Sequence, residues 1–149
     1  MTTEEIVYGW IKALVEAAAG DDPLSGAQVS KTAFGGVTSN RCIQIGPVLR
    51  ATPRPSAGGD EVEEFDAEIV IILLSQVADT KTDDDYASAR GDAIQMALSL
   101  ARAAFDDNTL GGAARDSMPD DLPRDFTTVA KTAPYAVANL KLKLNPSGA

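Results

Sequence analysis

The segment from Glu63 to Val77 constrains the fold of this chain more than any other part of the sequence. Its first half alternates acidic and apolar residues, with Glu64, Asp66 and Glu68 on one side of an extended chain. Side chains of a β-strand point alternately to opposite faces, so this pattern predicts one wet face and one buried face. From Ile69 to Leu74 every residue is apolar, and both faces then require cover. We expect helices of the same chain on one face and another subunit on the other.

A second strand, Arg41 to Arg50, precedes this segment and is expected to pair with it as a β-hairpin. Gly46-Pro47 interrupts the strand, and because proline cannot donate to a ladder, the interruption predicts an edge or a bulge. The Pro/Gly-rich segment Thr52–Asp60 predicts a loop, longer than the roughly two to five residues usual at a hairpin tip. Tips of this length are typically either functional or disordered, and Arg50 and Arg54 lie on or beside this one.

Two segments have the periodicity of amphipathic helices, Thr3–Ala19 and Tyr86–Phe105. We interpret Trp10, on the apolar side of the first, as a packing anchor rather than a ligand platform. Asp83-Asp84-Asp85 opens the second helix, where aspartates cap free amides and oppose the helix dipole. A calcium loop is the alternative, but the downstream Gly and Glu of such a loop are missing. The second helix has more apolar surface than one sheet face needs, so we expect part of it against the first helix and part at a subunit contact.

The remaining segments predict short elements. A weak strand covers Gln28–Phe34, a left-handed turn falls at Gly111 or Gly112, and a proline-bearing loop covers Asp116–Arg124. Two strands end the chain, Phe126–Lys131 and Tyr135–Leu144, followed by a short mobile end at 145–149. In the last strand we expect Leu140, Leu142 and Leu144 to face the core and Lys141 and Lys143 to face water. The predicted fold class is therefore α+β in one domain, 1–149: a mostly antiparallel sheet with two helices packed on one face and a long-tipped hairpin.

Composition excludes several classes of function. The chain has 13 basic and 22 acidic residues, a formal net charge of −9 that repels nucleic acid phosphates and anionic lipids. It has no histidine and one cysteine, which removes Ser-His-Asp and Cys-His catalysis, Cys/His zinc sites and internal disulfides. No signal peptide precedes the first helix, and the longest apolar run is too short to span a bilayer. These features predict a protein made and kept in the cytoplasm, with no membrane partner.

No motif in the sequence predicts a catalytic centre. The acidic row from Glu61 to Glu68 offers paired carboxylates, yet without a basic partner such a face is more typical of a solvated surface. Cys42 follows Arg41, which favours a lowered pKa, but a cysteine in a strand is typically a small buried hydrophobe. The glycine pairs at Gly35-Gly36 and Gly58-Gly59 lack the following helix of a phosphate loop. We therefore expect no catalytic residue, no cofactor and no metal.

The order of these elements resembles the lambda-type tail terminators of long-tailed bacteriophages and their tail-completion relatives. The resemblance covers most of the chain. It involves the helix Glu4–Ala19, the hairpin Cys42-Ile-Gln-Ile-Gly-Pro-Val with its return strand Ala67-Glu-Ile-Val-Ile-Ile-Leu, the helix Ala87–Phe105, the segment Asn108-Thr-Leu-Gly-Gly, and the ending Tyr135-Ala-Val-Ala-Asn-Leu-Lys-Leu-Lys-Leu. The segment Thr109-Leu-Gly-Gly112 after the long helix is the most similar.

The resemblance implies a structural virion protein at the head-proximal end of the tail, assembled in the host cytoplasm. Its partners would be five further copies of itself in a hexameric ring, the tail tube protein, and the head–tail connector or a neck protein. DNA would only pass through the lumen. The residues that we expect at protein interfaces are, first, those of the hairpin tip and, second, those of the acidic strand face: Arg50, Arg54, Glu64, Asp66 and Glu68.

Other functions remain open at this point. A head–tail joining or neck protein has a related fold and also forms rings. A small cytoplasmic ligand-binding or regulatory α+β domain would require a pocket with convergent polar groups. A hydrolase that uses only carboxylates is a third alternative. For the tip, a solvated loop competes with a surface that reaches an acidic neighbouring ring.

Overall fold

Strand β3 (Glu64–Gln76) lies at the centre of a five-stranded sheet with the order β1-β2-β3-β5-β4. The computed structural model describes residues 2–33, 36–54, 64–121 and 135–146. The other strands are β1 (Gln28–Ser30), β2 (Arg41–Arg54), β4 (Asp116–Asp121) and β5 (Tyr135–Asn145). Only β1 and β2 are parallel; all other neighbours are antiparallel. The fold is therefore the expected α+β class with a mostly antiparallel sheet.

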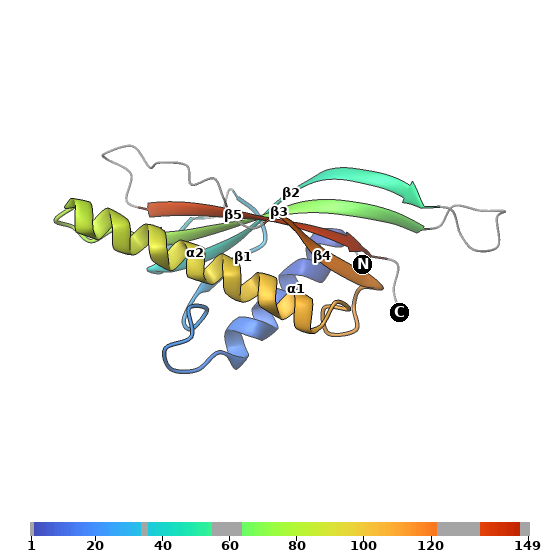
Figure 1. Ribbon diagram of the computed structural model, residues 1–149, viewed down its shortest axis with the longest axis horizontal. Coiled ribbons are helices and arrows are strands. Elements are labelled where there is room, and N and C mark those ends of the chain that lie inside the picture. Colours follow the sequence, from blue (N-terminus) through green and yellow to red (C-terminus); the bar gives the residue numbers. More distant parts are fainter. Residues whose placement is uncertain (1, 34–35, 55–63, 122–134, 147–149) are drawn as a thin grey trace.

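Both helices lie on the same side of this sheet (Figure 1). Helix α1 (Thr3–Ala17) packs on β2, β1 and β3, whereas α2 (Asp83–Asp106) packs on β5, β3 and β4. Their main contacts are with the sheet rather than with each other. The buried residues of both helices nevertheless belong to one hydrophobic core, and Phe105 of α2 stays 66% exposed.

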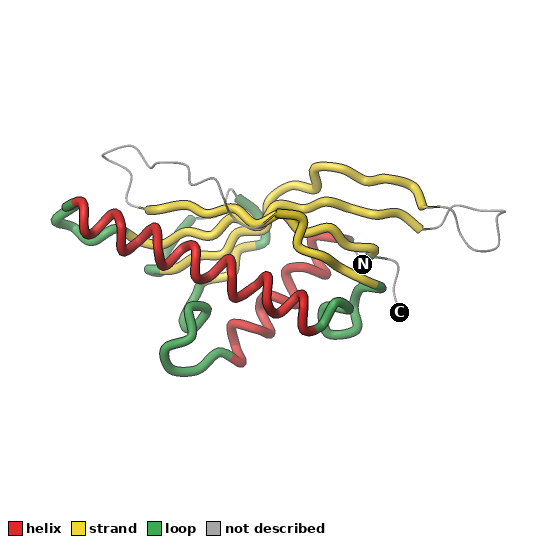
Figure 2. Tube along the Cα trace, in the orientation of Figure 1, coloured by secondary structure: helices red, strands yellow, loops and turns green. Residues whose placement is uncertain are grey.

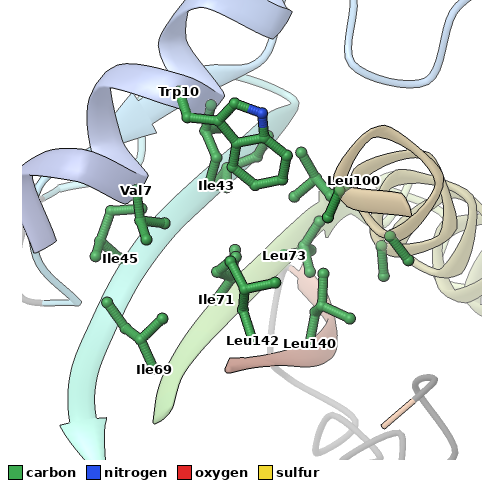
Figure 3. Close-up of a cluster of buried hydrophobic side chains, with 14 of the residues drawn as sticks. Val7, Trp10, Ile43, Ile45, Ile69, Ile71, Leu73, Leu100, Leu140 and Leu142 are labelled. Carbon is green, nitrogen blue, oxygen red and sulfur yellow. The ribbon is translucent and has the colours of Figure 1, made fainter. Parts of the chain in front are cut away.

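The core forms between the helices and alternate residues of the three central strands. Ile69, Ile71 and Leu73 of β3 are fully buried, and the predicted inward residues of β5, Leu140, Leu142 and Leu144, lie beside them. Figure 3 shows Trp10 of α1 above these strands, which confirms its role as a packing anchor. Each such aliphatic side chain stabilises the fold by about 1.5–3 kcal/mol when fully buried. The helices therefore stabilise the sheet by covering its apolar face.

Capping boxes start both helices. The hydroxyls of Thr2 and Thr82 accept hydrogen bonds from the backbone amides of Glu5 and Asp85. In return, the carboxylates of Glu5 and Asp85 accept hydrogen bonds from the backbone amides of the two threonines. The interpretation of the aspartate run as a helix start is confirmed, although the N-cap residue is Thr82 and the three aspartates form the first turn.

Three stretches are strands where the sequence predicted otherwise. Thr52–Arg54, predicted as loop, continues β2 because its backbone pairs with residues 64–66 of β3. Asp116–Asp121, predicted as loop, is edge strand β4 on β5, where the missing amide of Pro119 is tolerated. Asn145, placed in the mobile end, is the buried last residue of β5. The predicted strand Phe126–Lys131 and most of the hairpin tip lie outside the described residues.

The predicted irregularity at Gly46-Pro47 is confirmed as a β-bulge. The register of β2 on β3 shifts between Ile45 and Val48, and again between Val48 and Arg50. A Cβ atom on Gly46 would lie 2.7 Å from the carbonyl oxygen of Val70, closer than van der Waals contact permits. Only glycine therefore allows the two backbones to approach here.

We predict that Gly46→Ala destabilises the protein by about 1–3 kcal/mol, because the backbone of β3 must move to admit the methyl group. Gly91→Ala is the control: it lies inside α2 with no atom within 4 Å of the added Cβ. Alanine there should stabilise by about 0.5–1 kcal/mol through helix propensity. Urea unfolding of both variants measures the difference, and equal effects of the two substitutions would contradict the close approach at Gly46.

The turn after α2 is organised by one carboxylate. Asp107 accepts hydrogen bonds from the Thr109 hydroxyl at 2.6 Å, the Gly111 amide at 2.9 Å and the Thr109 amide at 3.1 Å. These bonds hold the pKa of Asp107 below its usual value. The chain then passes through three left-handed residues, Leu110, Gly111 and Gly112, which confirms the predicted turn and places Leu110 in the core.

A lowered pKa in the folded state means that this turn stabilises the protein above the unfolded pKa of about 4 and loses that contribution as the pH falls through the folded pKa. We therefore expect Asp107→Asn to have a lower Tm than the wild type at pH 7, and the difference to shrink below about pH 4. Asp106→Asn removes the same charge one residue earlier and serves as the control. Melting curves that stay equally far apart at pH 7 and pH 3 would refute this role of Asp107.

Candidate protein-interaction surfaces

The five predicted interface residues lie together on a two-stranded ribbon made by the distal halves of β2 and β3. The register pairs Arg50 with Glu68 and Arg54 with Glu64, and Asp66 lies between them opposite Thr52. These pairs follow one another at every second residue, so they belong to one face of the ribbon. Figure 2 shows the two strands continuing past the end of β5, since β5 pairs with β3 only from residue 67 onward. The register therefore places the two arginines and the three acidic residues on the same ribbon, while most of the tip lies outside the described residues.

This face is mixed in charge, which corrects the prediction of an acidic row without a basic partner. Arg50 Nε lies 3.7 Å from Glu68 Oε2, with the arginine side chain 73% exposed and the glutamate 17% exposed. A pair this long and this exposed contributes roughly 0–1 kcal/mol, so Arg50 can exchange partners at little cost. Asp66 is half-buried. The side chains of Arg54 and Glu64 lie outside the description.

The sheet face opposite the helices has an apolar centre. Leu74 and Cys42 are buried on this face, Val70 and Ile72 are half-buried, and the lysines predicted to face water, Lys141 and Lys143, are exposed. Burial raises the pKa of the Cys42 thiol, and Arg41 points to the other face of the sheet. Cys42 is therefore a small buried hydrophobic residue and not a thiol with a lowered pKa.

The two edges of the sheet are only partly paired. β1 covers residues 42–44 of β2, and in the described part of the chain no strand pairs with the outer side of β2 beyond them. At the opposite edge, β4 pairs with β5 alone among the described strands. Each edge has an exposed apolar side chain, Leu49 of β2 at 51% and Met118 of β4 at 61%. Unpaired edges are sites where another chain can add a strand.

A polar network that the sequence did not predict joins three elements at the other end of the sheet. Arg41 donates to both carboxylate oxygens of Asp92, at 2.9 Å from Nε and 2.8 Å from Nη2, and the Ser75 hydroxyl donates to Asp92 at 2.8 Å. An open cleft of about 740 Å³ lies beside it. Asp92 lies on α2, and no spacing in the sequence links it to Arg41 or Ser75.

Because this network ties β2 and β3 to α2, we interpret it as structural.

We predict that Asp92→Asn and Arg41→Met each destabilise the protein by about 1–2 kcal/mol, since the charged partner left behind stays partly buried. The double variant should cost clearly less than the sum of the two single variants. Urea unfolding of all four proteins measures this coupling, and strictly additive losses would show that the pair does not act as a unit.

In the described part of the chain, no three His, Cys, Asp or Glu side chains gather as metal ligands. Among the same residues, no helix has the length and apolar character needed to cross a membrane.

Neither the protein families nor the curated proteins compared with this sequence give a match.

Proposed function

We propose that this chain is a structural subunit of a phage tail, a tail terminator. Six copies form a ring on the last ring of the tail tube, stop its elongation and offer a surface to the head connector. The proposal rests on the resemblance in element order and on the surfaces described above.

The observation that supports it most is the one-sided construction of the sheet. Two helices bury one face, while in the described part of the chain the edges at β2 and β4 have unpaired backbone, with Leu49 and Met118 exposed beside it. The prolines, charges and bulge on these edges limit unspecific strand addition but do not cover them. In a subunit that joins neighbours side by side, both edges become interfaces and are buried in the assembly.

The net charge is consistent with a channel that DNA crosses. Six copies carry a formal charge of −54, since each carries −9. A ring with this charge repels phosphates and does not hold DNA as it passes. DNA is then a passenger rather than a ligand.

The projecting β2–β3 ribbon suits the contact with an adjacent ring. Its Arg50 is 73% exposed and only weakly paired, so it can turn to a carboxylate on another protein. On this proposal the face of the ribbon meets the adjacent ring, while the outer edge of the same ribbon and the edge at β4 join neighbours within the ring.

Deletion of the gene in the phage or prophage that carries it tests the proposal. We expect tails of variable and excessive length that do not join heads, restored to normal by the wild-type gene supplied in trans. Tails of normal length that fail to join heads would indicate a head–tail joining or neck protein instead. Normal tails attached to heads would refute both roles.

A further inference from the structure

Among the described strands, the outer edges of β2 beyond residue 44 and of β4 have no further neighbour, and the sequences of these two edges differ in charge. In sequence, the uncovered stretch of β2, residues 46–54, contains Arg50 and Arg54 and no acidic residue. β4 contains Asp116, Asp120 and Asp121 and no basic residue. Opposite charge on two edges of the same protein favours their contact between copies and disfavours contact of either edge with itself.

They are also complementary in apolar surface. Of the three large hydrophobic side chains that are exposed in the described part of the chain, two lie on these edges, Leu49 on β2 and Met118 on β4. The third, Phe105, is near the end of α2. Pairing the edges would bring both exposed side chains on the sheet into an interface.

Strand direction allows this contact. β2 is antiparallel to β3, β3 to β5, and β5 to β4, so β4 runs opposite to β2. A second copy placed beside the first in the same orientation therefore brings its β4 antiparallel to β2. The position that it would occupy continues the one that β1 fills beside residues 42–44. The six residues of β4 are fewer than the uncovered stretch of β2 can accept.

Prolines and bulges restrict the pairing. Pro47 and Pro53 of β2 and Pro119 of β4 have no amide to donate, and β2 is bulged between Ile45 and Arg50. Such features normally block uncontrolled strand addition. Here the prolines and the bulge confine the backbone amides that can donate to an added strand to the short stretch from Val48 to Thr52. This favours one register of pairing over the open-ended pairing of an aggregate.

We propose that copies of this chain join head to tail, with β4 of one copy against the outer edge of β2 in the next. The contact uses different surfaces on its two sides, so it generates a closed ring when the rotation between copies closes. This inference rests on the proposed function, because it names the interface that the ring would use.

Sedimentation velocity of variants blocked at one edge tests this interface. Leu49→Asp places an acid against acidic β4, and Met118→Lys places a base against basic β2. Each should weaken self-association at least tenfold, whereas Phe105→Lys, which alters the exposed residue away from both edges, should assemble like the wild type. All three positions are more than half exposed, so circular dichroism should show unchanged folding.

An equimolar mixture of the two edge variants distinguishes a head-to-tail contact from any self-matching one. Each variant keeps one intact edge, so the mixture should associate, at least as a 1:1 dimer, at concentrations where neither variant associates alone. Edge variants that still form wild-type assemblies, or a mixture that stays monomeric while the wild type assembles, would overturn the proposal.

Weak association is captured by cross-linking. Leu49→Cys/Met118→Cys treated with a short bismaleimide at high concentration should give a ladder of multimers, and Leu49→Cys/Phe105→Cys should give only background. Cys42 is fully buried and contributes no cross-link in the folded protein. No ladder at any concentration would overturn the interface.

The interface and the proposed function can fail separately. If both edge variants still form rings and tails of normal length, the proposed interface is wrong and the proposed function stands. If the rings depend on the edges but tails are normal after gene deletion, the interface stands and the proposed function is wrong.

Discussion

Burial of one face of β3 beneath two helices is the constraint on which the rest of the structure depends. Ile69, Ile71 and Leu73 have no exposed surface, and they pack with β5 and β2 on either side and with both helices above them. The bulge at Gly46 follows from this arrangement, because β2 must bend closely over Val70 while Val48 returns to the core. The turn at Asp107 likewise delivers Leu110 into the same core. These two features of unusual backbone therefore both serve the layer between helices and sheet.

A sheet covered on one face by its own helices has two ways to reduce its exposed surface further: cover of the second face, or extension at its edges. The described structure has a half-buried apolar centre on the second face and unpaired backbone at both edges. The edges differ in charge, one with arginines and one with aspartates, and this difference favours neighbours joined in one direction. On this account the net charge of −9 and the difference in charge between the edges have separate roles. The net charge repels DNA, and the edge charges direct the contact between copies.

Strong periodicity allowed the sequence to predict most of the fold. The inward residues of α1, the alternation of Leu140, Leu142 and Leu144, and the break at Gly46-Pro47 were each visible without coordinates, because each reflects a local spacing. β4 was missed because its six residues include a proline and three aspartates, and only the free edge of β5 makes them a strand. The pairing of Arg50 with Glu68 and of Arg41 with Asp92 depends on register and on packing between distant segments, which no single-sequence pattern encodes.

Electron microscopy of the purified, negatively stained protein over a range of concentrations tests the central claim most directly. The account predicts rings of about sixfold symmetry with an open channel, becoming more frequent as the concentration rises. Single-subunit particles at every concentration, including samples treated with a short cross-linker, would contradict the claim that this protein is built to join its own copies.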